Sequence, residues 1–309
     1  MIPIRSRGPG PLGVPATLVA LGVATLLAGT PAAAQEGPRL FISVDMEGLG
    51  GVGTPAMTSS SGKDYATGRQ LATDEVNVVV EAILARHPGA EILVNDSHGD
   101  HQNLLHTELD PRVTYIQGSI KPLGMVQGLD DTFDGAIFLG YHAMAGDPDG
   151  FLAHTGSGSV KGLWLNEVEV GEGGMNAAFA GSHGVPVILV AGDEAAAREL
   201  DTLLDAEIVT TKVAETPASA RLVHPDIVHD RLRDGVGRGL DRLASGGFQP
   251  WDPGTPVRIR MRFASTTHVE ILQSIPGMTK VDGFTVGYTA ADAEEAYRLI
   301  RLMYRFVGI

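Results

Sequence analysis

The sequence predicts an α/β protein with a largely parallel central sheet, helices on both faces of that sheet, and a smaller C-terminal α/β subdomain. Two observations lead to this fold class. From residue 38 to about residue 204, short apolar runs alternate with longer segments of helical periodicity, and such alternation is typical of parallel strands joined by helices. After residue 215 the pattern changes to a long polar helix, a Gly/Pro-rich connection and an alternating strand. We therefore expect a main domain over residues 35–214 and a subdomain over residues 215–309.

Strands are expected in the main domain wherever a short apolar run ends in polar residues or a turn. These runs occupy residues 38–47, 90–99, 135–143 and 185–194, and residues 162–172 have the pattern of a hairpin. Helices are expected between them, where apolar residues recur at helical spacing or small residues predominate. The helical segments are residues 62–89, which end at a Pro-Gly break, residues 173–184, which end at Gly184, and residues 195–204.

The C-terminal subdomain is expected to begin with a long polar helix over residues 218–245. A connection rich in glycine and proline follows it, and then apolar and arginine residues alternate as in a half-buried strand. The remaining expected elements are strands at residues 257–265 and 284–290, a short helix at residues 269–274 and a terminal helix at residues 292–306.

Composition narrows the classes of function. The chain has 309 residues, of which 43% are hydrophobic, so it can bury a large core. Its formal net charge of -14 disfavours binding to nucleic acid or to anionic membranes, because nothing offsets the repulsion of phosphates. It contains no cysteine. Any metal site must therefore be built from histidine and carboxylate side chains.

The N-terminus has the layout of a secretory signal peptide over residues 1–34. Arg5 and Arg7 are the only charged side chains before Glu36, an apolar stretch covers residues 14–27, and three alanines then provide a small-x-small cleavage site that ends at Ala34. The alternative is an uncleaved anchor, but the apolar stretch is short for a spanning helix. We expect an exported protein, periplasmic or secreted, with no stable membrane insertion after cleavage.

The hexapeptide SVDMEG, residues 43–48, raises the first question about chemistry. Asp45 and Glu47 are spaced by one residue at the end of an apolar run, so both side chains project from the same face of the strand. Two carboxylates this close repel each other unless water, a proton or a cation lies between them. The pair is therefore either a solvated strand end or part of a metal site.

Similar endings recur in other elements and favour the metal site. The second apolar run ends with Asp96 and His98, the third ends near His142, and the hairpin ends with Glu172. The carboxyl ends of parallel strands meet at one edge of a sheet, where sites commonly form. Three carboxylates and two imidazoles are too many ligands for one catalytic zinc ion, but they suit two ions if Asp45 bridges them.

At this point the sequence resembles the bacterial D-aminopeptidases associated with dipeptide transport, which are zinc metallopeptidases. The resemblance rests on SVDMEG, VNDSHG, KPLGMVQGLDDTFDGAIFLGYHA, AHTGSGS and VGEGGMNA, and it runs from about Arg39 to the C-terminus, more weakly after residue 215. It implies a homo-oligomeric ring that admits only small peptides. It also implies a catalytic role for His154 and two zinc ions. The implied ligands are the five residues already selected: Asp45, Glu47, His98, His142 and Glu172.

The sequence therefore predicts a two-zinc aminopeptidase that hydrolyses short peptides with D-amino-acid N-termini, such as D-Ala-D-Ala. Mn²⁺ or Co²⁺ could replace Zn²⁺, because sites of histidine and carboxylate accept all three. Two alternatives stay open: an exported metal-dependent amidohydrolase acting on a non-peptide amide, and a non-catalytic metal- or peptide-binding protein. The relatives that carry the resemblance are cytoplasmic, so the export signal bears on the physiological substrate.

Three further residues are left with open or minor roles. Lys121 is a candidate for binding a substrate carboxylate or a neighbouring subunit. Asp96 is either a partner that orients a liganding imidazole or a turn-former. His101 is expected, like the remaining histidines, to be a surface or loop residue.

Overall fold

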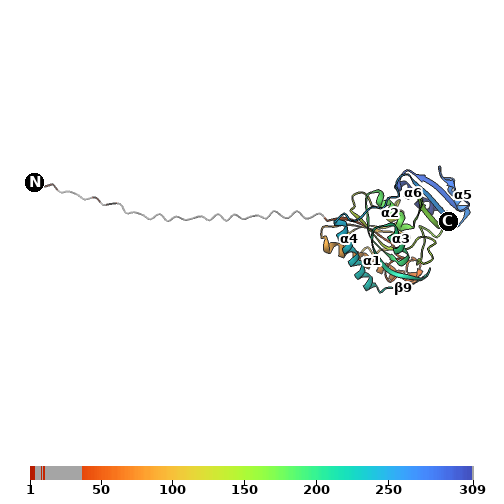
Figure 1. The fold of residues 1–309 in the computed structure, drawn as a ribbon. Helices are drawn as coiled ribbons and strands as arrows, with labels where there is room; N and C mark the ends of the chain where they lie inside the picture. The colour runs from red at the N-terminus through yellow and green to blue at the C-terminus, as the bar shows by residue number, and fades with distance from the viewer. Residues whose placement is uncertain (4–7, 9, 11–36, 308–309) are drawn as a thin grey trace. The chain divides into compact units, whose positions relative to one another are not determined.

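A computed structural model describes residues 1–3, 8, 10 and 37–307 (Figure 1). Most of the predicted signal peptide lies outside the described residues, so export stays a prediction. Within the described part of the chain, no helix has the length and apolarity needed to cross a bilayer.

The central sheet has seven strands in the order β3-β2-β1-β4-β7-β8-β9. All neighbouring pairs are parallel except β8 and β9. The strands are β1 (Arg39–Val44), β2 (Glu91–Asp96), β3 (Thr114–Ile116), β4 (Gly135–Tyr141), β7 (Val187–Asp193), β8 (Glu207–Thr216) and β9 (Ser219–Leu222). Every residue of β4 and β7 is buried, as expected for parallel strands with both faces covered by other elements.

Alternate residues of each central strand enter two different cores. On one face, Leu40 and Ile42 of β1 pack with α1 (Tyr65–Arg86) and α4 (Pro225–Ala244). On the other face, Phe41 belongs to a core that contains residues of α2 (Glu172–Ser182) and α3 (Glu194–Leu203). Helices therefore cover both faces of the sheet, and the predicted α/β class is confirmed.

A second sheet of five antiparallel strands has the order β11-β12-β10-β5-β6. Its strands are β5 (Val160–Leu165), β6 (Val168–Glu169), β10 (Val257–Phe263), β11 (Thr279–Lys280) and β12 (Thr285–Ala290). The predicted alternation in β10 is present, because its apolar residues are buried and its three arginines are exposed. The helices α5 (Thr266–Leu272) and α6 (Ala293–Val307) accompany this sheet (Figure 1), and α6 also packs against α2.

The structure differs from the predicted long helix at residues 218–245. Residues Ser219–Leu222 form β9, which pairs with β8 across a tight turn at residues 217–218. The helix α4 begins only at Pro225, where the imidazole of His224 accepts a hydrogen bond from the amide of Asp226. Proline favours the first turn of a helix, so Pro225 marks the start of α4 more reliably than the polar residues before it, which were predicted to be helical.

The predicted division into a main domain and a C-terminal subdomain near residue 215 stays a prediction. In the structure, α4 follows that boundary and packs against α1 and β8. The second sheet takes β5 and β6 from before residue 215 and β10 to β12 from after it. The described residues 37–307 group as one compact unit.

Candidate metal centre

The predicted site residues lie where the strand order of the central sheet reverses. β1 has β2 and β3 on one side and β4, β7 and β8 on the other. The crevice at the carboxyl ends of strands around such a reversal is a common ligand site. Asp45 and Glu47 follow β1, His142 follows β4, and His98 follows β2. Glu172 is the first residue of α2, directly after the predicted hairpin.

The segment after β1 lies tightly against the end of β4. The amide of Asp45 donates to the carbonyl of Leu139 at 2.8 Å, and the amide of Gly48 donates to that of Gly140 at 2.7 Å. A β-carbon at residue 48 would lie 1.9 Å from the carbonyl oxygen of Tyr141, so only glycine fits. This close approach explains the glycine in SVDMEG and holds the two carboxylates beside His142.

One imidazole lies between the paired carboxylates. Nδ1 of His98 is 3.0 Å from Oδ1 of Asp45 and 3.0 Å from Oε2 of Glu47. The other ring nitrogen, Nε2, is 2.8 Å from the carbonyl oxygen of Thr58, just after the short helix η1 (Pro55–Met57). A carbonyl can only accept a hydrogen bond, so Nε2 carries a proton. In the neutral ring, Nδ1 then presents a lone pair to Asp45 and Glu47.

The second imidazole repeats this arrangement with the ring reversed. Nδ1 of His142 is 2.9 Å from the carbonyl oxygen of Ala143, which leaves Nε2 as the free nitrogen. Nε2 lies 3.4 Å from Oδ2 of Asp45 and 3.6 Å from Oε2 of Glu172. It is buried and has no hydrogen-bond partner among the described residues. The two oxygens of Asp45 therefore face two different imidazoles.

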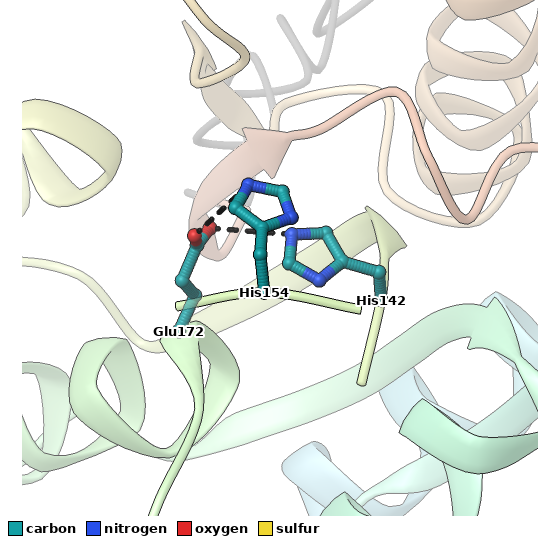
Figure 2. Close-up of side chains that lie close together, drawn as sticks. All are labelled: His142, His154 and Glu172. Carbon is teal, nitrogen blue, oxygen red and sulfur yellow. Dashed lines mark ion pairs between the residues drawn. The ribbon is translucent and has the colours of Figure 1, made fainter. Parts of the chain in front are cut away.

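The third imidazole belongs to His154, and Figure 2 shows its ring lying face to face with that of His142. The ring centroids are 4.1 Å apart, and the planes differ by 11°. Nδ1 of His154 is 2.9 Å from the carbonyl oxygen of Leu152, while Nε2 is 3.6 Å from Oε1 of Glu172. The side chain of His154 is 32% exposed, whereas those of the five predicted ligands are at most 13% exposed.

These atoms can hold metal ions. Ligand atoms of Asp45, Glu47 and His142 lie within 4.8 Å of one another, and so do those of His142, His154 and Glu172. Each of the three imidazoles has one nitrogen bonded to a backbone carbonyl and the other directed at carboxylates. This is the usual arrangement of histidine ligands, in which the outer hydrogen bond fixes the tautomer and the ring orientation.

The pKa values of the clustered side chains show the effect of placing several carboxylates together in a buried site. Burial, reinforced by the charge of Glu47, raises the pKa of Asp45 to about 6. Burial opposes the charged imidazolium of His98 and His142, but the neighbouring carboxylates outweigh it and raise both pKa values well above the usual range. In the metal-free protein, protons on the imidazoles therefore neutralise the buried carboxylates, and a metal ion must displace them.

Two residues of β8, which sequence reasoning missed, support the segment that carries the carboxylate of Glu47. Thr211 donates its hydroxyl to the carbonyl of Gly48 at 2.6 Å, and the buried ammonium of Lys212 donates to the carbonyls of Glu47 and Val52. Asp96 accepts hydrogen bonds from the amides of residues 103 and 104. Asp96 therefore holds the loop that follows His98.

A cavity of about 170 Å³ opens beside this cluster. Asp45, His98, His154 and Glu172 line one part of it, and its wall also includes side chains of α6. Those side chains are Arg301, Tyr304 and Arg305. They lie far from the ligands in sequence and have no motif of their own, so sequence reasoning missed them.

Two further residues of this region are His101 and Lys121. His101, predicted to be a surface or loop residue, lies in a loop, but it is only 4% exposed and lines the cavity. Burial, together with the charges of Lys121, Arg301 and Arg305, lowers the pKa of His101 to about 3, so its ring is neutral. Lys121 is not among the residues that line the cavity, and its ammonium donates to Oδ1 of Asn95 at 2.7 Å and to the carbonyl of Asp96.

Comparisons with known proteins identify relatives of this chain. A family model described as D-aminopeptidase matches residues 39–302. The D-aminopeptidase of Bacillus subtilis (strain 168) is 35% identical over 269 residues, which cover 86% of this chain and 96% of the relative. The solved structure of the zinc-dependent D-aminopeptidase DppA from Bacillus subtilis, described as a self-compartmentalizing protease, superposes with a TM-score of 0.83. It is 34% identical, and the match covers 87% of this chain and 98% of DppA.

Proposed function

Because this chain belongs to the D-aminopeptidase family of metallopeptidases, we propose that it uses two zinc ions to hydrolyse short peptides with D-amino-acid N-termini, such as D-Ala-D-Ala. The observation that supports two ions is the position of Asp45, whose two carboxylate oxygens face His98 and His142 separately. One ion would be held by Asp45, Glu47 and His98. The other would be held by Asp45, His142 and Glu172.

The charge of the site suits two divalent cations. Three buried carboxylates surround the proposed positions, and four positive charges would neutralise them with room for one further anionic ligand. Two such ions polarise a carbonyl group and lower the pKa of water when they are bound. Mn²⁺ or Co²⁺ would fit the same donor atoms.

We assign His154 to chemistry and not to metal binding. Its ring is held by the Leu152 carbonyl and by stacking on His142, so Nε2 has a fixed direction toward Glu172 and the cavity. It is also the most exposed of the six side chains, and a peptide in the cavity can reach it. Nε2 either transfers a proton or attacks the scissile carbonyl, and both roles need it free of metal.

We also propose that the protein is exported and forms a closed homo-oligomeric ring. Export follows from the predicted signal peptide at residues 1–34. The ring is inferred from similarity to DppA, which is described as self-compartmentalizing. A ring with the active sites facing inward would restrict access to small peptides, and a periplasmic location would provide D-Ala-containing fragments of the cell wall.

A hydrolysis panel tests the proposed function. Purified mature protein, metal-free and then reloaded with zinc, is given D-Ala-D-Ala, L-Ala-L-Ala and the mixed dipeptides. We expect turnover of the peptides with D-configured N-termini only after reloading. Zinc binding without turnover of any dipeptide would refute the peptidase assignment. Non-peptide amides would then separate an amidohydrolase from a binding protein.

A further inference from the structure

The cavity beside the proposed metal centre is lined by cationic side chains as well as by carboxylates. Arg301 and Arg305, both on α6, contribute these cationic side chains. We propose that these two guanidinium groups bind the free α-carboxylate of a short peptide whose N-terminal residue lies at the metal centre. This inference rests on the proposed peptidase function and adds a requirement for a C-terminal carboxylate close to the scissile bond.

Arg301 is a buried cation without an anionic partner among the described residues. Its side chain donates to the carbonyl of Lys121 at 3.0 Å and to the hydroxyl of Tyr304 at 2.9 Å, and no described carboxylate forms an ion pair with it. The residue is only 7% exposed. A buried charge is costly unless an anion pairs with it, so the cavity beside Arg301 is suited to an anionic group.

The guanidinium of Arg301 is also held in one place. It lies so close to Gly124 that a β-carbon there would be 1.8 Å from its Nη1. A fixed guanidinium offers its remaining N–H groups as a planar fork, and this geometry matches a carboxylate. Because the group is already ordered, little side-chain entropy is lost when a ligand binds.

Arg305 lies four residues further along α6 and therefore on the same face of the helix. It lines the rim of the cavity, its guanidinium approaches the hydroxyl of Ser119 at 3.5 Å, and it forms no ion pair within the described part of the chain. Arg298 on the same helix is different, because it pairs with Glu294 at 2.7 Å. Carboxylates are plentiful in a chain of net charge -14, yet none of the described ones pairs with these two neighbouring arginines. We take this as an indication that the arginines bind an external anion.

The conformation of His101 adds an independent observation. Its backbone has a φ of +62°, which is unfavourable for a residue other than glycine, and such strain concentrates at functional sites. Its Nδ1 is buried without a hydrogen-bond partner among the described residues. The neutral ring lines the same cavity, so it can place a polar atom beside a bound carboxylate without bringing a charge of its own.

The size of the cavity limits the ligand. Its volume of about 170 Å³ is below the roughly 300–1,000 Å³ typical of drug-sized sites. One end would take the amino-terminal residue at the metals, and the other would take the carboxylate at the arginines. The substrate class is therefore peptides of two or three residues with a free C-terminus, and a peptide amide would lack the group that the arginines bind.

The test compares D-Ala-D-Ala with D-Ala-D-Ala amide as substrates of the zinc-loaded full chain. We expect the wild type to favour the acid over the amide in kcat/KM by about tenfold or more, the scale of a charge-assisted hydrogen bond. In Arg305→Gln this ratio should fall by about tenfold, with bound zinc unchanged. Arg305→Lys keeps the charge and should restore part of the ratio. Arg298→Gln, on the same helix, is the matched control and should keep the wild-type ratio.

Each outcome has a distinct meaning. An equal kcat/KM for acid and amide in the wild type, with no effect of Arg305→Gln, overturns the carboxylate site and leaves the peptidase assignment in place. A shift in oligomeric state in Arg305→Gln with an unchanged ratio also overturns it, and shows that the arginine contacts another subunit. Failure of the wild type to hydrolyse either compound overturns both proposals.

Discussion

Replacing His154 with alanine separates chemistry from metal binding. The fold should survive, because the replacement removes one hydrogen bond, to the Leu152 carbonyl, from a side chain that is one-third exposed. Such a bond contributes about 0.5–1.5 kcal/mol to the free energy of unfolding, and the loss of stacking on His142 adds a comparable amount. These losses are small beside the roughly 5–15 kcal/mol stability of a typical domain.

The effect of His154→Ala on turnover should be much larger. General acid-base catalysis contributes ~10²–10⁴ in rate, and a lost nucleophile would cost at least as much. We therefore expect kcat for D-Ala-D-Ala to fall by at least about a hundredfold, with zinc content by elemental analysis unchanged. His183→Ala is the control, since that half-buried imidazole also packs on an aromatic ring, at 4.8 Å from Phe179, outside the site. Near-normal kcat, or loss of a zinc ion, in His154→Ala would refute the assignment.

Four other measurements test the site, its support by β8 and the predicted export. Asp45→Ala should abolish activity and lower bound zinc from about two ions per chain toward one or none, and full metal content by elemental analysis would remove the bridging role. Lys212→Met should lower the free energy of unfolding, measured by urea titration, by about 2–6 kcal/mol, because the buried carbonyls of Glu47 and Val52 each lose a hydrogen-bond donor at a cost of about 1–3 kcal/mol. An unchanged urea concentration at the midpoint of unfolding would contradict this prediction. Zinc affinity should rise with pH from 6 to 8, because neighbouring carboxylates raise the pKa values of His98 and His142 and a metal ion must displace the protons of both rings. Calorimetry in buffers of different ionisation enthalpy should detect the release of these protons on zinc binding. If no protons are released, both rings are already neutral in the metal-free protein. Protein recovered from the native host should begin at or near Gln35, and N-terminal sequencing that finds Met1 on cytosolic protein would exclude cleavage.

The clustering of the proposed ligands could be predicted from the sequence because their positions follow a local rule. Asp45 and His142 each come directly after an apolar strand, and neighbouring parallel strands bring such positions together at one edge. The reversal of strand order between β1 and β4 adds the crevice, but the order itself depends on long-range pairing that no local pattern encodes. The resemblance to a known family supplied His154, whose loop shows no apolar run to fix its position.

The missed features share one physical cause, which is that they depend on contacts between distant segments. Arg301 lies 180 residues from Lys121, the residue whose carbonyl it contacts, and its helical pattern is that of an ordinary amphipathic helix. Lys212 looks like a surface residue in an alternating strand, yet β8 places it under the turn that follows Asp45. The segment at residues 219–222 has only four residues, too few for a clear periodic pattern, and its pairing with β8 depends on the fold.

The order in which the residues of the cavity occur along the chain has a consequence for the synthesis of the protein. Every proposed metal ligand lies between residues 45 and 172, whereas Arg301 and Arg305 come about 130 residues later. A growing or truncated polypeptide that ends before residue 300 would contain the complete set of ligands and lack both arginines. Such a fragment, if its sheet formed, would bind zinc without selecting substrates by their carboxylate. On the proposed roles, the residues that select the substrate are therefore the last part of the site to be synthesised, after all five proposed metal ligands.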